Sequence, residues 1–192
     1  MDASGVIRKL LPSERGEVRA HLLRLDPEDR WLRFAGPASD ARIEAYCEGL
    51  DESITTMIGY VVDGEVRGLG ELKPLDAAWP RAGEAAVSVE RPFQNRGVGT
   101  ALLRRLIVIA RNRSIRSLSM LCLLENGRML RIARKAGARI EFDHGEVGAS
   151  LALPWPTHLT FLLEHLDDLR AVVAAGPPAG RPEEAARSER AA

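Results

Sequence analysis

The residues whose types and spacing could do chemistry are Gln94, Gly97 and Gly99, which lie between a predicted apolar strand and a predicted apolar helix. Two glycines separated by one residue let backbone N–H groups approach a bulky anion without obstruction by Cβ atoms. The helix that begins there adds unpaired N–H donors and the positive end of its dipole, and Arg96 adds a full charge nearby. Together these features favour the binding of a pyrophosphate.

The type of nucleotide is constrained by what this turn lacks. A P-loop requires two glycines separated by four residues, with Lys and then Ser or Thr directly after the second glycine, and the sequence contains no such run. The dinucleotide fingerprint requires a third glycine three residues after the second, where this chain has Leu102. A Gly-x-Gly pair is also typical of a tight turn before a packed helix, so the turn by itself leaves a purely structural role open.

The elements on both sides must position the turn. Residues 84–89 are apolar at nearly every position, as in a central strand that is covered on both faces. Apolar residues recur at helical spacing from Gly97 to Asn112, which predicts a helix packed against a sheet. The elements predicted after this unit are a strand over 117–123, a helix over 126–136 and a hairpin of strands 139–142 and 146–153.

The segment before the turn combines helices with an antiparallel hairpin. Asp63-Gly64 is a strong hairpin signal between two stretches rich in strand-forming residues. Asp26 is a predicted N-cap followed by Pro27 at the first helical position, and Ser13 is the predicted N-cap of the preceding helix. The predicted elements are strands 6–10, 54–62 and 65–73, helices over 14–25 and 39–50 with a third starting at Pro27, and an irregular loop 74–83.

This order of elements predicts an α/β (α+β) fold in which helices flank a mixed sheet. The length fits one globular domain with an appendage, and we expect that domain to cover residues 1–156. Residues 157–175 carry leucines at helical spacing and predict an amphipathic helix, whose apolar stripe is exposed unless it packs on the core or on a second copy in a homodimer. Residues 176–192 are rich in Pro, Ala, Arg and Glu and predict a disordered tail.

Composition and charge argue against several classes of function. The chain carries 27 basic and 27 acidic side chains, so no overall charge attracts nucleic acid or an anionic membrane. Its apolar runs are too short to cross a bilayer and its first residues do not resemble a signal peptide, so we expect a cytoplasmic protein without membrane partners. Cys47 and Cys122 show no CxxC pattern and His158 and His165 lack a third ligand, so we expect no metal.

Residues 84–137 resemble, piece by piece, the acetyl-CoA-binding core of the GNAT superfamily of N-acetyltransferases. The family signature Gln/Arg-x-x-Gly-x-Gly/Ala matches Gln94, Gly97 and Gly99, between an apolar strand and a long apolar helix. Further along, the family has a strand ending in Asn, then a helix and Gly, and Asn126 and Gly137 occupy these places. The resemblance extends over residues 5–153 and implies a mostly antiparallel sheet of six or seven strands.

The resemblance implies direct transfer of an acetyl group from acetyl-CoA to a primary amine, either a protein lysine or a small molecule. The backbone of residues 87–89 would pair with the pantetheine arm like an added strand, and the amides of the turn would hold the pyrophosphate. A backbone N–H, that of Val89 or a neighbour, would polarise the thioester carbonyl. The residues expected at the cofactor are Val87, Ser88, Val89, Gln94, Asn95, Arg96, Gly97, Val98, Gly99, Thr100 and Asn126.

Residues 25–34 look like a segment of the GNAT domains of bacterial protein lysine acetyltransferases of the Pat type, although a capped helix with an aromatic face also explains them. An amine is protonated near neutral pH, so a base or a water relay must remove a proton before attack. Pat-type enzymes carry their catalytic Glu at the start of the central strand, which makes Glu84 the candidate base; a solvated carboxylate at a strand start is the alternative. Glu71 is the second candidate and Glu90 the third.

The chain departs from the family at Ala133. Many GNAT enzymes have a Tyr at this place as the general acid for the leaving thiolate, whereas Pat-type domains also lack it. An acyl-CoA sensor that has kept the pocket and lost the chemistry is therefore the alternative function. The loop 74–83 and the helices within 26–50 should line the acceptor side, where Asp40, Glu44 and Asp76 would suit a cationic acceptor.

Overall fold

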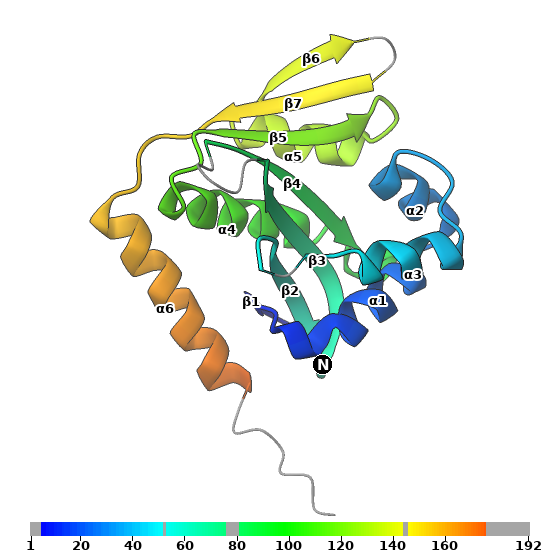
Figure 1. Cartoon of the computed structure of the whole chain (residues 1–192), viewed down its shortest axis with the longest axis horizontal. Coiled ribbons are helices and arrows are strands. Elements are labelled where there is room, and N and C mark those ends of the chain that lie inside the picture. The colour runs from blue at the N-terminus through cyan, green and yellow to red at the C-terminus, as the bar shows by residue number, and fades with distance from the viewer. Residues whose placement is uncertain (1–4, 52, 76–80, 144–145, 176–192) are drawn as a thin grey trace, which may run out of the picture.

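In the part of the chain that the structure describes, seven strands form one sheet in the order β1-β2-β3-β4-β5-β7-β6 (Figure 1). This computed structural model describes residues 5–51, 53–75, 81–143 and 146–175. Neighbouring strands are antiparallel except β4 and β5, which are parallel. The strands are β1 (Val6–Lys9), β2 (Thr56–Val62), β3 (Glu65–Pro74), β4 (Ala82–Val89), β5 (Ser117–Leu123), β6 (Arg139–Asp143) and β7 (Glu146–Ala152). The predicted mixed, mostly antiparallel sheet is confirmed.

The β2–β3 hairpin turns at Asp63 and Gly64, as the sequence predicts. Both residues have positive φ, 51° and 83°, and a two-residue turn of type I′ requires this at both central positions. Such a turn matches the right-handed twist of the flanking strands, and it places Val62 opposite Glu65. The hairpin thereby brings β3 alongside β4 at the middle of the sheet.

Strands β4 and β5 are paired over only part of their length. Cα partners run from Ala82 to Glu84 on β4, and Glu84 lies opposite Ser119 on β5. Beyond Glu84, β4 is paired with β3 alone and β5 with β7 alone. The two ribbons diverge toward their carboxyl ends in Figure 1. The edge of β4 over residues 85–89 is therefore open on the side of β5.

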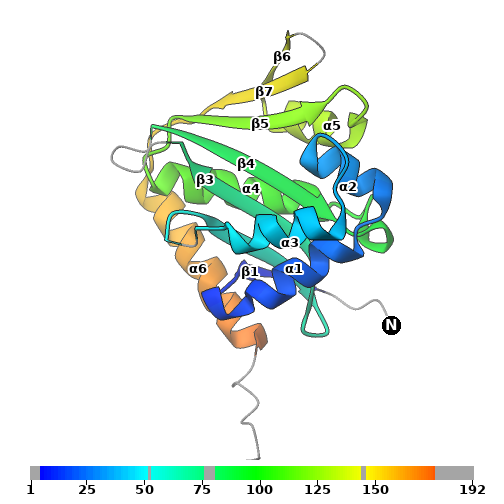
Figure 2. The ribbon, with the colours of Figure 1, turned by 45° about the vertical axis from the view of Figure 1, so that its right-hand side comes forward.

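Helices cover both faces of the sheet and give three layers (Figure 2). One core lies between the sheet and two helices on one face, and includes Leu102, Leu106 and Leu118. A second core lies beneath helices on the other face, and includes Leu22 and Ile43. The first pair of helices is α4 (Val98–Asn112) and α5 (Gly127–Lys135); the second face carries α1 (Arg15–Arg24), α2 (Pro27–Phe34) and α3 (Asp40–Glu48).

Side-chain caps set the starts of α2 and α3. Asp26 Oδ1 accepts a hydrogen bond from the backbone N–H of Asp29 at 2.9 Å, and Ser39 Oγ accepts one from that of Arg42 at 3.3 Å. Each cap satisfies a donor that the first turn of a helix leaves free. The predicted cap at Asp26 is thus present, and it fixes the helix whose inner side borders the open edge of β4.

The predicted cap of α1 is wrong. Ser13 lies within a 3-10 turn, and α1 begins two residues later at Arg15. The turn forms because the Glu14 carboxylate accepts a hydrogen bond from the backbone N–H of Leu11 at 2.8 Å and pairs with Arg8 at 2.5 Å. The partner on β1 therefore overrides the local preference of Ser13 for a cap.

Helix α6 (His158–Ala175) packs on α4 and β1 with its polar side. Lys9 in β1 contacts Glu164 at 2.6 Å and Asp168 at 2.8 Å, and the buried Arg105 of α4 contacts Asp168 at 2.7 Å. The large apolar side chains of α6 that stay exposed are Leu159, Phe161, Leu162, Leu163, Leu166 and Leu169. The core therefore leaves the predicted apolar stripe uncovered.

Some sequence predictions lie outside the described residues. These are the turn between β6 and β7 at 144–145, the tail 176–192 and the part of the loop 74–83 that carries Asp76. Within the described ranges, no helix is both long enough and apolar enough to cross a membrane.

Candidate active site

A pocket of about 270 Å³ opens at the free edge of β4. Residues of the turn before α4, of α2 and of α5 line the pocket together with β4. Of the residues predicted at the cofactor, all except Arg96 line it: Val87, Ser88, Val89, Gln94, Asn95, Gly97, Val98, Gly99, Thr100 and Asn126. The structure thus brings the strand and the turn of the predicted motif together around one cavity.

The turn itself has the backbone that its glycines require. Gly97 has φ of 84° and serves as the N-cap of α4, and Asn95 also has a positive φ of 59°. A side chain at position 97 would be strained in this left-handed conformation. The N–H groups at the start of an α-helix have no partner within the helix, so those of Val98, Gly99 and Thr100 are available at the pocket wall. This is the arrangement that suits a phosphate group.

Gln94 ties the turn to its surroundings. Its side-chain Nε2 donates to the carbonyl of Val89 at 2.8 Å and to Asp29 Oδ2 at 2.8 Å. Arg128 on α5 donates to the side-chain oxygen of Gln94 and to Asp29 Oδ1, the latter at 3.0 Å. The signature glutamine therefore has a positioning role, because it links β4, α2 and α5 around the cavity.

Three cations on α5 line the pocket and were not among the residues predicted from the sequence. They are Arg128, Arg131 and Lys135, and their spacing of three and four residues places them on one face of the helix. That spacing is visible in the sequence, and it is the signal by which these three residues could have been predicted. Asn126, at the start of the same helix, accepts a hydrogen bond from the N–H of Met129 at 3.0 Å. Its side chain thus caps α5 at the pocket wall.

Glu84, the predicted base, lies outside the lining of this pocket. It is exposed, and it is the last residue of β4 that is paired with β5, so it stands at the apex of the opening between the two strands. Its carboxylate makes no hydrogen bond or ion pair with the residues that the structure describes. Its catalytic role stays a prediction.

The second candidate, Glu71, is fully engaged. It is 5% exposed, pairs with Arg33 at 2.5 Å and accepts a hydrogen bond from the hydroxyl of Tyr46. Burial, followed by the nearby charge of Glu71, raises the pKa of the Tyr46 hydroxyl, so this donor keeps its proton. Glu71 therefore has little capacity left to accept a proton from a substrate. Arg33 lines the pocket, which places this cluster directly behind the wall.

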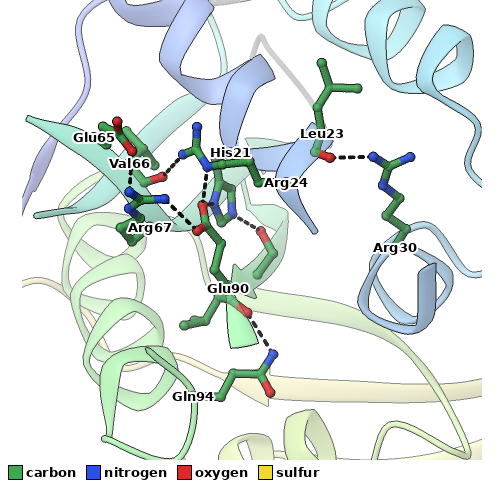
Figure 3. Close-up of polar contacts among 11 residues, drawn as sticks. His21, Leu23, Arg24, Arg30, Glu65, Val66, Arg67, Glu90 and Gln94 are labelled. Atoms are coloured by element: carbon green, nitrogen blue, oxygen red, sulfur yellow. Dashed lines mark hydrogen bonds and ion pairs between the residues drawn. The ribbon is translucent and has the colours of Figure 1, made fainter. Parts of the chain in front are cut away.

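The third candidate, Glu90, belongs to a buried polar network (Figure 3). One carboxylate oxygen lies 3.2 Å from His21 Nδ1 and accepts from Arg24 Nε at 2.9 Å, and the other accepts from Arg67 at 3.0 Å. The second ring nitrogen of His21, Nε2, lies 2.9 Å from Ser88 Oγ. Nothing in the local sequence links these residues, because His21 is separated by more than sixty positions from both partners.

The structure also locates the two cysteines, two of the acids expected on the acceptor side, and Ala133. Cys47 and Cys122 are free and buried, and burial raises the pKa of the Cys122 thiol to about 11. No group of three metal-ligating side chains occurs among the described residues. On the expected acceptor side, Asp40 pairs with Arg30 at 2.6 Å, whereas Glu44 is exposed. Ala133 is fully buried in the core.

Residues 21–138 match the acetyltransferase (GNAT) family. The chain belongs to this family. A similar protein is the acetyltransferase PA5475 of Pseudomonas aeruginosa, which is 27% identical over 117 residues, 59% of this chain and 63% of that protein. The match thus spans less than two thirds of that relative.

Solved structures of acetyltransferases share the fold. The GNAT domain of S. lividans PAT superposes with a TM-score of 0.67 at 21% identity, over 77% of this chain and 89% of that domain. The yncA protein of Salmonella typhimurium, solved with its cofactor acetyl-CoA, gives a TM-score of 0.60 at 15% identity, over 80% of this chain and 96% of that protein. The predicted GNAT family and fold are confirmed. The family is one of acetyltransferases, in agreement with the enzyme class predicted from the sequence, and the predicted cosubstrate, acetyl-CoA, is the cofactor in the yncA structure.

Proposed function

We propose that this chain transfers an acetyl group from acetyl-CoA to a primary amine, such as a protein lysine, by direct attack of the amine on the thioester. The observation that carries the proposal is the pocket along the open edge of β4, which runs from the Gly97 turn toward the point where β4 and β5 separate. An open strand edge can pair with an extended chain that contains amides, and pantetheine is such a chain. The adjoining helix start suits its pyrophosphate.

The donor phosphates would be held from two sides. The first N–H groups of α4 would face the pyrophosphate, and Arg128, Arg131 and Lys135 on α5 would add positive charge from the opposite wall. Phosphate groups are strong acceptors for charged donors, and an arginine can bind two oxygens at once. The presence of both backbone donors and charged side chains supports a ligand with several phosphates, such as CoA.

Glu84 is the proposed base on the acceptor side. It stands at the apex of the opening, where an extended arm that starts at the turn would end. Its carboxylate has no partner among the described residues, whereas cations engage those of Glu71 and Glu90. The amine would lose a proton to Glu84, directly or through a water, and form the C–N bond. The C–S bond would then break, and CoA would leave as the thiolate and take up a proton.

We predict that Glu84→Gln slows acetyl transfer without weakening the binding of acetyl-CoA. General base catalysis contributes about 10²- to 10⁴-fold, so kcat should fall by about 10²-fold or more while the Kd for acetyl-CoA stays within about twofold. Release of CoA thiol is followed with acetyl-CoA and a panel of peptides and small amines. Glu141→Gln, at an exposed acid on β6 away from the pocket lining, is the matched control. Equal rates for both variants and the wild type would remove Glu84 from the mechanism.

A sensor that binds acyl-CoA without turnover is the second candidate, and Ala133 is the observation that favours it. Where many GNAT enzymes have the acid Tyr, this chain has a small buried residue that cannot donate a proton. Thermal stabilisation by acetyl-CoA together with no thiol release on any amine of the panel would support the sensor.

We also infer that two copies associate through α6. Its exposed leucines 159, 162, 166 and 169 follow the alternating spacing of three and four residues that is typical of helix pairs. The polar side of the helix is already engaged by Lys9 and Arg105, so the leucines point away from the core. A second α6 would cover them.

A further inference from the structure

A chain of hydrogen bonds connects the buried interior to the proposed CoA pocket at Ser88. Ser88 lies on β4, lines the pocket and is 8% exposed. Its Oγ is 2.9 Å from Nε2 of the fully buried His21, whose Nδ1 is 3.2 Å from Glu90. The chain of contacts therefore runs from a carboxylate, through an imidazole, to the hydroxyl of a residue that lines the pocket.

The charges around His21 fix which nitrogen carries its proton. Glu90 is ionised, because the hydrogen bonds from His21, Arg24 and Arg67 outweigh the effect of burial and lower the pKa of its carboxyl. Burial lowers the pKa of His21 against the opposing pull of Glu90; the other charged groups that act on the ring are Arg24 on α1 and Glu71 on β3. His21 is therefore a neutral ring near pH 7, with Nδ1–H donating to the Glu90 carboxylate.

The protonation state of His21 determines which hydrogen bonds Ser88 can make. Nε2 of a neutral ring that donates through Nδ1 is an acceptor only, so the contact at 2.9 Å requires Ser88 to donate its proton to His21. A hydroxyl has one proton and two lone pairs. With the proton committed to His21, Ser88 can offer a ligand in the pocket nothing except a lone pair. It is thus an acceptor that recognises an N–H donor.

The position of Ser88 selects the part of the ligand that it meets. It lies four residues beyond Glu84 along β4, about 13 Å at the usual rise of a strand, and so between the apex of the opening and the Gly97 turn. An extended cofactor would place its middle there, between thioester and pyrophosphate. We propose that Ser88 accepts a hydrogen bond from an amide N–H of the pantetheine arm, and that His21 and Glu90 fix its hydroxyl in this orientation. This inference rests on the proposed function.

The test compares two ligands that differ by the arm. Calorimetry with the full chain measures the Kd of CoA and of 3′-phosphoadenosine 5′-diphosphate, which keeps the adenosine and the phosphates and lacks pantetheine. Ser88→Ala should raise the Kd of CoA by about 3- to 10-fold, the usual contribution of one hydrogen bond. The Kd of the shorter ligand should stay within about twofold of the wild-type value. Ser88→Thr, which keeps a hydroxyl, should restore CoA binding. Ser117→Ala on β5, outside the pocket lining, should change neither Kd.

A second measurement uses the wild-type chain and needs no folded variant of Ser88. The ring nitrogens of His21, assigned in NMR spectra by comparison with His21→Gln, should shift when CoA binds and stay unchanged with the shorter ligand. CoA affinity that is equal in Ser88→Ala and wild type, or equal losses for both ligands, would overturn the inference and leave the proposed function standing. Failure of the wild type to bind CoA at all would instead overturn the proposed function.

Discussion

Gly99 shows how one residue type serves two purposes at this site. In the sequence motif, a glycine at this position lets an anion reach the backbone N–H groups. The structure adds that a Cβ at this position would lie 3.1 Å from Ile132 Cδ1 and 3.8 Å from Val87 Cγ1. Gly99 therefore also allows α4, α5 and β4 to approach one another closely around the pocket.

We predict that Gly99→Val blocks the cofactor. The added side chain would stand beside the first N–H groups of α4 and obstruct the pyrophosphate, so the affinity for CoA should fall by about tenfold or more, a loss of about 1.4 kcal/mol in binding free energy. Calorimetry measures this, and thermal unfolding shows that the fold is retained. Gly127→Ala, where an added Cβ meets no atom within 4 Å, is the control and should bind CoA like the wild type. Unchanged affinity in Gly99→Val would mean that the ligand lies elsewhere.

The limits of sequence-based prediction are clearest for single residues. The signature Gln94, Gly97 and Gly99 could be found because its parts are neighbours in sequence. The partners of Glu71 and Glu90 could not, because Arg33 and His21 come from distant helices and meet the carboxylates only after the sheet has formed. Which acid is free to act as a base is therefore a property of the folded chain.

Among the elements, α6 departs most from what its sequence suggests. Its leucine pattern predicts an apolar stripe that packs either on the core or on a second copy, and the helix contacts the core through Thr160, Glu164 and Asp168 instead. Arg105 and Lys9 supply the positive charge on α4 and β1 that makes this possible. Hydrophobic periodicity locates the helix, but the complementary charges on distant elements decide which side faces inward.

We predict from this arrangement that the chain is a dimer in solution and that Leu162→Glu makes it a monomer. The substitution places a charge in the leucine face and leaves the polar contacts of α6 unchanged, so the protomer should keep its thermal stability. Sedimentation velocity measures the mass. Leu121→Glu, at an exposed leucine on β5, is the control and should remain a dimer. A wild-type chain that sediments as a monomer at micromolar concentration would contradict the dimer.

For the whole molecule, the order of elements was enough to predict the layered fold. Asp63 and Gly64 fix a hairpin, the apolar residues of β4 place it at the centre, and the amphipathic α4 must cover it. The separation of β4 from β5 after Glu84 could not be read from the sequence, because strand pairing between distant segments leaves no local signal. That separation creates the pocket on which the proposed function depends.

The central claim is that CoA lies along the open edge of β4 with its pyrophosphate at the start of α4. Amide hydrogen exchange of the chain with and without CoA tests the binding and its place in one measurement. We expect saturating CoA to slow the exchange of amides within residues 85–100, and most strongly those of Val98, Gly99 and Thr100. Unchanged exchange there at millimolar CoA, or protection confined to another surface, would contradict it.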